Sequence, residues 1–594
     1  MPGPDPRQTS ASRAVITPRV VAISLLAVVI AAAAAVAAQG LTHLIALITN
    51  LAFYGRLSAS WVGPAGHHLG AWVICVPVAG ALLIGVLARW GSPAIRGHGI
   101  PEAMEQVLYN DSRVPARMTL LKPLSAAISI GTGGPFGAEG PIIATGGALG
   151  SLLGQLLPVT HGERKTLLAA GAAAGMSATF GSPVAAVLLA VELLLFELRP
   201  RSLIPVALAA ATAAAVRIAF LGSHPAFLMP DISEPAGAAL LGYVLIGAVI
   251  GVASAGVSRL VYAVEDAFEH LRLHWMWWPA LGGLVVGVIG WLSPRTMGVG
   301  YDNIEALASG AMLPGAIALL VLAKWVSWSI SLGSGTSGGT LAPLFTLGAG
   351  LGGLLGGGMI ALWPGLGIDV RIAGLVGMAA MFAGASRALL TSIVFAYETT
   401  RHQGGLLPLL AGCSAAYLSA SLTMRTSIMT EKLARRGARV PDEYEIDPLH
   451  QLRVHEVASR PPSTLGAQRP LAEVRAWLAS DAPEAVHHSF PVVDGDLLVG
   501  MVTREELLDQ ARPGGAPVRA ALHTGPVHAV REDATVREAM EIMAVADIGR
   551  VPVLGHTAPH AVVAILSRSD LLSAERRRLA REAEVVRTLR TRFG

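Results

Sequence analysis

Long apolar stretches, separated by short polar connections, fill the first three quarters of the chain. The first has no charge from Val20 to Ala38 and continues as apolar sequence to Phe53. A helix needs about 20 apolar residues to cross a bilayer, so this pattern predicts a membrane-spanning helix. Similar stretches follow near residues 69–87, 116–130, 142–157, 166–195, 203–221, 238–264, 280–292, 311–332, 341–363, 372–397 and 406–422.

Several of these stretches are too short for a complete span or are broken by glycine and proline. Irregular backbone is tolerated at membrane depth only where it is buried in protein or lines a water-filled cavity. The pattern therefore predicts a multi-pass α-helical membrane protein with broken, re-entrant helices that mark a pathway. A membrane-anchored receptor would have no need of such helices.

An internal repeat divides the apolar part into two halves. Pro141 and Pro343 are each followed five residues later by a Gly/Leu-rich run, at residues 146–154 and 348–356, with an offset of 202. The same offset relates residues 175–180 to residues 377–382. Further on, Glu192 and Glu398 end two similar helices but are out of register by four residues. Duplicated halves with broken helices are typical of transporters that bind their substrate between the halves.

The composition agrees with this division and shows a second part. Only 14% of the residues are charged, against about 25% in soluble proteins. The share is about a tenth in residues 1–440 and about a quarter afterwards, where β-branched strands and amphipathic helices begin. A second repeat relates residues 489–508 to residues 550–572 and predicts two small α/β units. The predicted division is a leader (1–14), a membrane domain (15–437), a linker (438–449), two soluble domains (450–512 and 513–576) and a basic C-terminal helix (577–594).

Charge and cysteine content exclude several classes of function. A formal net charge of +4 is too balanced for a nucleic-acid-binding protein. Two cysteines in apolar stretches leave no disulfide framework or thiolate metal site. No nucleophile and base form an evident pair, so we do not expect an enzyme. The polar leader and the long first apolar segment predict a retained helix with a cytoplasmic N-terminus.

Three glycine-rich stretches stand at predicted helix starts, and each ends in proline. They cover residues 97–101, 137–141 and 339–343. Proline suits the first helical turn, the glycines leave backbone N–H groups uncovered, and a helix N-terminus carries about half a positive charge. These features predict an anionic ligand held by partial charges, which release a permeant ion more readily than a fixed Lys or Arg. No Gly-Lys-Ser/Thr follows, which disfavours a nucleotide.

Together these stretches resemble the GSGIP, GREGP and GxFxP signatures of the CLC family of chloride channels and proton/chloride antiporters, over residues 15 to 437. The resemblance implies two inverted repeats, a homodimer with one pore per subunit, chloride and protons as transported ions, and a bacterial inner membrane. Glu139 matches the external gating glutamate; a helix-capping carboxylate is the alternative interpretation. The implied anion-binding positions are Gly97, His98, Gly99, Ile100, Gly137, Ala138, Gly140, Gly339, Thr340, Leu341 and Met429.

Four of these positions depart from the family pattern. His98 replaces the serine of the first motif, Ala138 the basic residue of the second, and Leu341 the aromatic residue of the third. Met429 stands where the ion-coordinating tyrosine is expected. Two interpretations of His98 stay open, since its ring could donate an N–H to the ion or satisfy a local backbone carbonyl.

The family's internal proton acid is also missing. Counting from Pro183, Glu192 is the first acid of the usual pair, and Leu193 occupies the position of the proton acid. We therefore expect passive, channel-like anion conduction gated by Glu139, with Glu192 as a helix-end carboxylate. One alternative is a proton-coupled antiporter with a substitute relay through Glu192, Glu197 or His98. A second is a membrane-anchored nucleotide sensor.

The repeat in the charged part resembles a tandem pair of CBS domains, a common cytoplasmic appendage of CLC proteins. By this resemblance Thr503, Ser567 and Asp570 could hold an adenine nucleotide, although Glu506 departs from the usual aspartate. The alternative is a regulatory and dimerisation module without a ligand. No other cofactor is expected.

Overall fold

The computed structural model describes residues 18–230, 232, 235, 237–436, 452–522, 525–555, 561–574 and 576. It divides into two units, one within residues 15–444 and the other formed mainly by residues 445–594. The predicted leader (1–14), linker (438–449) and basic C-terminal helix (577–594) lie outside the described residues.

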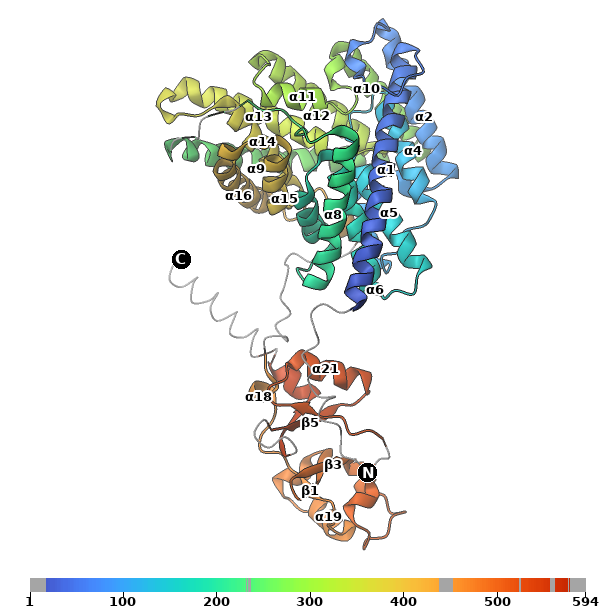
Figure 1. The fold of residues 1–594 in the computed structure, drawn as a ribbon, viewed down its shortest axis with the longest axis vertical. Coiled ribbons are helices and arrows are strands. Elements are labelled where there is room, and N and C mark those ends of the chain that lie inside the picture. Colours follow the sequence, from blue (N-terminus) through green and yellow to red (C-terminus); the bar gives the residue numbers. More distant parts are fainter. Residues whose placement is uncertain are drawn as a thin grey trace. The chain divides into compact units, whose positions relative to one another are not determined.

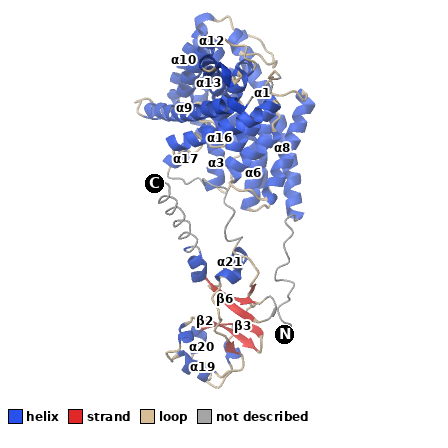
Figure 2. Ribbon diagram, turned by 90° about the vertical axis from the view of Figure 1, so that its left-hand side faces the viewer, coloured by secondary structure: helices blue, strands red, loops and turns tan. Residues whose placement is uncertain are grey.

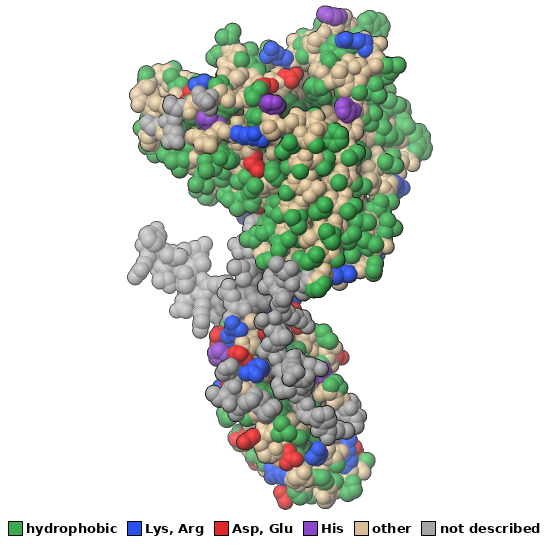
Figure 3. Space-filling view, viewed as in Figure 1, with side chains coloured by type: hydrophobic (Ala, Val, Ile, Leu, Met, Phe, Trp, Pro, Cys, Tyr) green, Lys and Arg blue, Asp and Glu red, His purple; other side chains and the backbone are tan. Residues whose placement is uncertain are grey.

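The first unit is a bundle of helices of very unequal length (Figures 1 and 2). Among the described residues, eight helical segments are long and apolar enough to cross a membrane. Hydrophobic side chains cover most of the face of this unit seen in Figure 3, so the chain is an integral membrane protein. Its α-helices are α1 (Pro18–Tyr54), α2 (Cys75–Trp90), α3 (Ile100–Tyr109), α4 (Met118–Gly131), α5 (Glu139–Leu156), α6 (His161–Phe180), α7 (Pro183–Ala190), α8 (Pro200–Leu221), α9 (Gly237–Glu269), α10 (Trp278–Leu292), α11 (Tyr301–Ala308), α12 (Pro314–Gly333), α13 (Leu341–Leu362), α14 (Val370–Ser386), α15 (Leu389–Thr400), α16 (Leu406–Thr423) and α17 (Glu431–Arg435).

The duplication is visible in how the helices pack. Helix α5 packs against α6 and, in the second half, α13 packs against α14, both through glycines. A Cβ on Gly146 would lie 2.1 Å from the Gly171 carbonyl oxygen, and one on Gly348 would lie 2.3 Å from that of Gly377. The predicted duplicated, broken-helix fold is confirmed, and many of its repeated glycines permit close helix contact.

Two carboxylates join the halves reciprocally. Glu192 accepts hydrogen bonds from the backbone N–H groups of Leu390 and Thr391, each at 2.9 Å, at the start of α15. Glu398 accepts from the N–H groups of Val184 and Ala185, at 3.1 and 2.9 Å, at the start of α7. Each half thus caps a helix of the other, which agrees with the interpretation of Glu192 as a helix-end carboxylate.

The four-residue shift between the two acids has a local cause. Phe180 ends α6, whereas its counterpart Phe382 is followed by four more helical residues to Ser386 at the end of α14. This extra turn delays α15 relative to α7 by four residues. The spacing from the helix start to its acid is therefore the same in both halves.

Replacing Glu192 by alanine should destabilise the membrane unit. The change removes the acceptor of two backbone N–H groups and of the Thr391 hydroxyl; both contacts with Thr391 are buried and the one with Leu390 is partly buried. We expect a loss of about 2–4 kcal/mol in the free energy of unfolding, measured in detergent by thermal or denaturant unfolding. Glu305→Ala, at an exposed position on α11, is the control. Equal unfolding curves for both variants would contradict the capping role.

The second unit contains two copies of one small fold, as predicted. Each copy has a three-stranded sheet in which the first two strands are parallel and the last two antiparallel. Each also has its own apolar core, around Phe490 in the first and Val551 in the second. The elements are α18 (Val454–Val457), β1 (Leu465–Gly466), α19 (Leu471–Leu478), β2 (Ser489–Asp494), β3 (Leu497–Thr503), α20 (Arg504–Leu508), β4 (Val530–Arg531), α21 (Val536–Val545), β5 (Arg550–Leu554) and β6 (Val562–Ser567).

Candidate functional site

The three glycine-rich stretches meet in the interior of the membrane unit. The Gly97 N–H donates to the Thr336 carbonyl oxygen at 3.1 Å. Gly137 and Gly339 exchange backbone hydrogen bonds of 3.1 and 2.8 Å. These contacts bring the N-termini of α3, α5 and α13 together, although the stretches are far apart in the sequence.

Glycine is required at several of these positions by geometry. Gly97 and Gly99 have φ angles of 91° and 97°, which L side chains rarely adopt. At Gly140 a Cβ would lie 2.2 Å from the carbonyl oxygen of His98. The motif glycines thus allow the loops to approach one another more closely than any side chain would permit. The remaining positions of these motifs, Ile100, Ala138, Thr340 and Leu341, are buried at the helix starts.

Glu139, the first residue of α5, is completely buried with its carboxylate between two helix starts. Its Oε1 accepts a 2.5 Å hydrogen bond from the Tyr301 hydroxyl. The carboxylate also interacts with the backbone amides of Glu139 and Ala342, while Oε2 has no direct partner. A Cβ on Gly137 would lie 1.7 Å from Oε2, so the carboxylate is folded back over this glycine. It occupies a place where backbone N–H groups favour negative charge.

His98 and Met429, which replace the serine and the tyrosine of the family pattern, lie near each other. His98 is 7% exposed, interacts with the backbone of Ile428, and has no partner for its Nδ1. Met429, the next residue after Ile428, is fully buried. One ring nitrogen can satisfy a carbonyl while the other remains available, so both interpretations of His98 are compatible with this geometry. The charged groups that interact with His98 are Glu102, Lys122 and Lys432.

Two buried lysines were not predicted from the sequence, which led us to expect no fixed cation near the ligand. Lys122 Nζ donates to the Ile95 and Gly97 carbonyl oxygens, both at 2.9 Å. Lys324 Nζ donates to those of Thr296 and Gly298, at 3.0 and 3.1 Å. The two lysines are 202 residues apart, the offset of the repeat, and that spacing could have revealed them.

Tyr301 was not predicted either. It begins α11 directly after Gly298-Val299-Gly300, which repeats the Gly-x-Gly pattern that precedes α3 at an offset of 201. Gly298 and Gly300 have φ angles of 66° and 76°. The recurring Gly-x-Gly was the signal that a fourth helix start belongs to this region.

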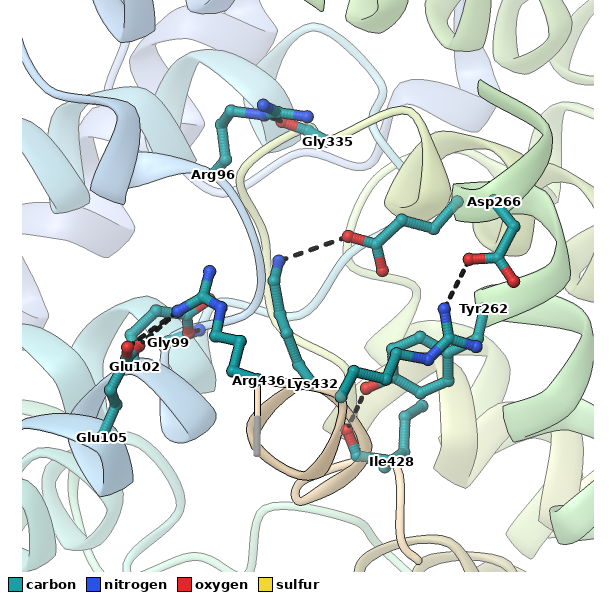
Figure 4. Close-up of polar contacts among 12 residues, drawn as sticks. Arg96, Gly99, Glu102, Glu105, Tyr262, Asp266, Gly335, Ile428, Lys432 and Arg436 are labelled. Atoms are coloured by element: carbon teal, nitrogen blue, oxygen red, sulfur yellow. Dashed lines mark hydrogen bonds and ion pairs between the residues drawn. The ribbon is translucent and has the colours of Figure 1, made fainter. Parts of the chain in front are cut away.

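Helix α17 follows the loop that carries Met429, and it is fastened to two other helices (Figure 4). The hydroxyl of Tyr262 on α9 donates to the Ile428 carbonyl oxygen at 2.8 Å. The basic side chains of α17 are paired with acids of α9, Lys432 with Glu265 and Arg435 with Asp266. Arg436, the residue after α17, is paired with Glu105 of α3. These contacts fix the position of Met429 beside His98.

The second unit holds a separate cavity of about 1190 Å³. Thr503 lines it together with residues 547–550, whereas Ser567 and Asp570 do not. All three predicted nucleotide-binding residues make local contacts: Thr503 donates to Glu506 at 2.8 Å, and Ser567 donates to Asp570 at 2.5 Å. Of the three residues, only Thr503 is part of the lining of this cavity. Among the described residues, no group of three or more His, Cys, Asp or Glu side chains could hold a metal ion.

Comparison with known proteins identifies the family of the chain. The family model described as "Voltage gated chloride channel" matches residues 80–421, more than half of the chain. The chain belongs to this family. CBS domains match at residues 454–512 and 518–577 of the CLC chain, which confirms the resemblance of its second unit.

Named relatives of this CLC chain are transport proteins. It is 32% identical over 367 residues to a "Putative chloride channel protein ClcB-like" of Ralstonia nicotianae, covering 61% of this chain and 85% of the relative. It is 29% identical over 398 residues to an "H(+)/Cl(-) exchange transporter ClcA" of Vibrio parahaemolyticus, covering 64% of this chain and 84% of the relative.

Solved structures confirm the CLC fold. A slow cyanobacterial Cl−/H+ antiporter superposes with a TM-score of 0.63 at 23% identity, covering 71% of this chain and 98% of that one. A eukaryotic CLC transporter superposes with a TM-score of 0.55 at 22% identity, covering 93% of this chain and 97% of that one.

Proposed function

We propose that the protein transports chloride, or a similar small monovalent anion, across a membrane, with Glu139 as the gate. The observation that carries this proposal is the buried Glu139 carboxylate, seated between the N-termini of α5 and α13. A site that accepts a carboxylate by means of backbone dipoles can accept a halide in its place. Exchange of the two negative charges at one position is the basis of gating.

We further propose that anion movement is coupled to protons in exchange. Several relatives are named H(+)/Cl(-) exchange transporters, and a structure of similar fold is that of a Cl−/H+ antiporter. These likenesses favour the exchange mechanism, which was our alternative to passive conduction. Glu139 is suited to it, because leaving the anion position is easiest once the carboxylate has gained a proton. The proton can then be released on the other side when the carboxylate returns.

Passive conduction is the second candidate, because the chain lacks the family's internal proton acid. Leu193 cannot carry a proton, and Glu192 is held by the start of α15. Exchange therefore needs another internal acid. Glu197 is one candidate, because it is only partly buried and contacts Ser202 and Arg199 rather than a helix start. His98, next to Glu102, is another.

The two forms of transport predict different reversal potentials. In proteoliposomes with opposed chloride and proton gradients, exchange should displace the reversal potential from the chloride equilibrium value toward the proton gradient. It should also drive protons uphill when chloride flows downhill. A reversal potential that follows chloride alone would establish the passive channel and overturn exchange. Absence of any anion flux would contradict the transport proposal itself.

The remaining expectations extend this proposal. We propose that the protein is a homodimer with one pore per subunit in a bacterial inner membrane, with its N-terminus and CBS domains in the cytoplasm. Every proposed anion ligand precedes Lys432, so the CBS pair should tune transport rather than create it. The cavity beside Thr503 is large enough for an adenine nucleotide and is lined by Arg504, Arg512 and Arg550, which supports nucleotide regulation.

A further inference from the structure

Tyr301 links the gate to the space around it. Its hydroxyl donates to Glu139 Oε1 at 2.5 Å, and Tyr301 is among the lining residues of two cavities of about 240 and 200 Å³. Trp61 lines both cavities as well, whereas Glu139 lines neither. Tyr301 therefore contacts the gating carboxylate and also lines both of these spaces.

The ring of Tyr301 is held by aromatic neighbours from three other segments. Trp61 is stacked on it with centroids 6.4 Å apart and an interplanar angle of 21°. Phe180 and Phe227 meet it edge to face at 5.8 and 6.0 Å. Phe180 is in turn fixed by Phe395 at 4.8 Å. Packing on several sides leaves the ring little freedom to follow Glu139 when that side chain moves.

A fixed hydroxyl needs a second acceptor once the first has left. A buried donor without an acceptor is costly, and a halide accepts hydrogen bonds from neutral donors just as a carboxylate does. A neutral hydroxyl also fits the requirement that the ion be released, which a new fixed charge would hinder.

We propose that Tyr301 is a ligand of the anion position, donating its hydroxyl to Glu139 when the gate is closed and to the transported anion when Glu139 has withdrawn. The inference rests on the proposed function. The chain then has a tyrosine hydroxyl at the gate, contributed by Tyr301 of its second half. At the position of the family's ion-coordinating tyrosine it has Met429. The charged group that interacts with Glu139 is Lys324 on α12, whose ammonium donates to two backbone carbonyls.

Tyr301→Phe removes the hydroxyl and keeps the ring. In full-length protein reconstituted in proteoliposomes, the external pH that gives half-maximal chloride flux should rise by about one unit, because a charge-assisted hydrogen bond to the ionised carboxylate is lost. Tyr54→Phe is the matched control: it removes a hydroxyl bonded to the Gly63 carbonyl and should leave the pH profile unchanged.

The ligand role is isolated in a gate-free background. Chloride binding in detergent, measured by calorimetry, should be about five- to tenfold weaker in Glu139→Gln/Tyr301→Phe than in Glu139→Gln alone. Equal chloride affinities would overturn the proposal and reduce Tyr301 to a latch on Glu139. If Glu139→Gln binds chloride but no variant carries flux, the proposed function fails while the ligand assignment is still decided by the affinities.

Discussion

Glu139→Gln is expected to conduct anions with almost no dependence on external pH. In the native protein a single titrating gate should reduce flux by up to about tenfold for each pH unit above its midpoint. A neighbouring anion disfavours the ionised carboxylate, so acidification should open the gate. Glutamine resembles the protonated acid in shape and cannot ionise, and we expect its flux to change less than about twofold between pH 5 and pH 8.

Flux assays in proteoliposomes at a series of external pH values test this expectation. Glu305→Gln is the matched control, because it neutralises an exposed acid on α11 and should keep the native profile. If exchange is the mechanism, Glu139→Gln should also abolish proton movement driven by chloride. A native pH profile in the mutant would refute the assignment of the gate.

Gly137→Ala should open the gate without removing the carboxylate. The new Cβ would lie 1.7 Å from Glu139 Oε2, the mobile end of a side chain, so Glu139 has to leave its seat. Gly137 is not among the glycines with positive φ, and its backbone accepts alanine. We expect about tenfold more chloride flux at pH 7.5 than in the native protein, and a flattened pH profile.

Two further variants make this test specific. Gly315→Ala adds a Cβ that meets nothing within 4 Å and should leave flux unchanged. Combining Gly137→Ala with Glu139→Gln should add little to the effect of Glu139→Gln, because both changes act on the same carboxylate. Additive effects of the two substitutions would mean that the alanine acts elsewhere.

The helix starts of the site could be predicted from the sequence because their determinants are local. Glycine before proline specifies where a chain turns into a helix, and three such turns at Gly99, Glu139 and Leu341 needed no knowledge of the fold. The contacts of Tyr301 and Lys324 could not be predicted in this way. Tyr301 and Glu139 are 162 residues apart in the sequence. The ammonium of Lys324 donates to carbonyls that are 28 and 26 residues away in the sequence.

The CBS residues show the same limit. Thr503 with Glu506, and Ser567 with Asp570, form polar contacts at helix starts between residues only three positions apart. Whether these starts share a cavity depends on how the two copies pack together, which the local sequence does not encode. Only Thr503 lines the large cavity.

The reciprocal caps of Glu192 and Glu398 limit the kind of motion that can move an anion. Many transporters with two related halves alternate access by rocking one half against the other. Here such rocking would pull a carboxylate of each half away from a helix start of the other, and would leave four backbone N–H groups without their acceptors. The reciprocal hydrogen bonds therefore hold the two halves together as one rigid unit. Access to the pathway then has to change through small movements of individual side chains inside this rigid unit.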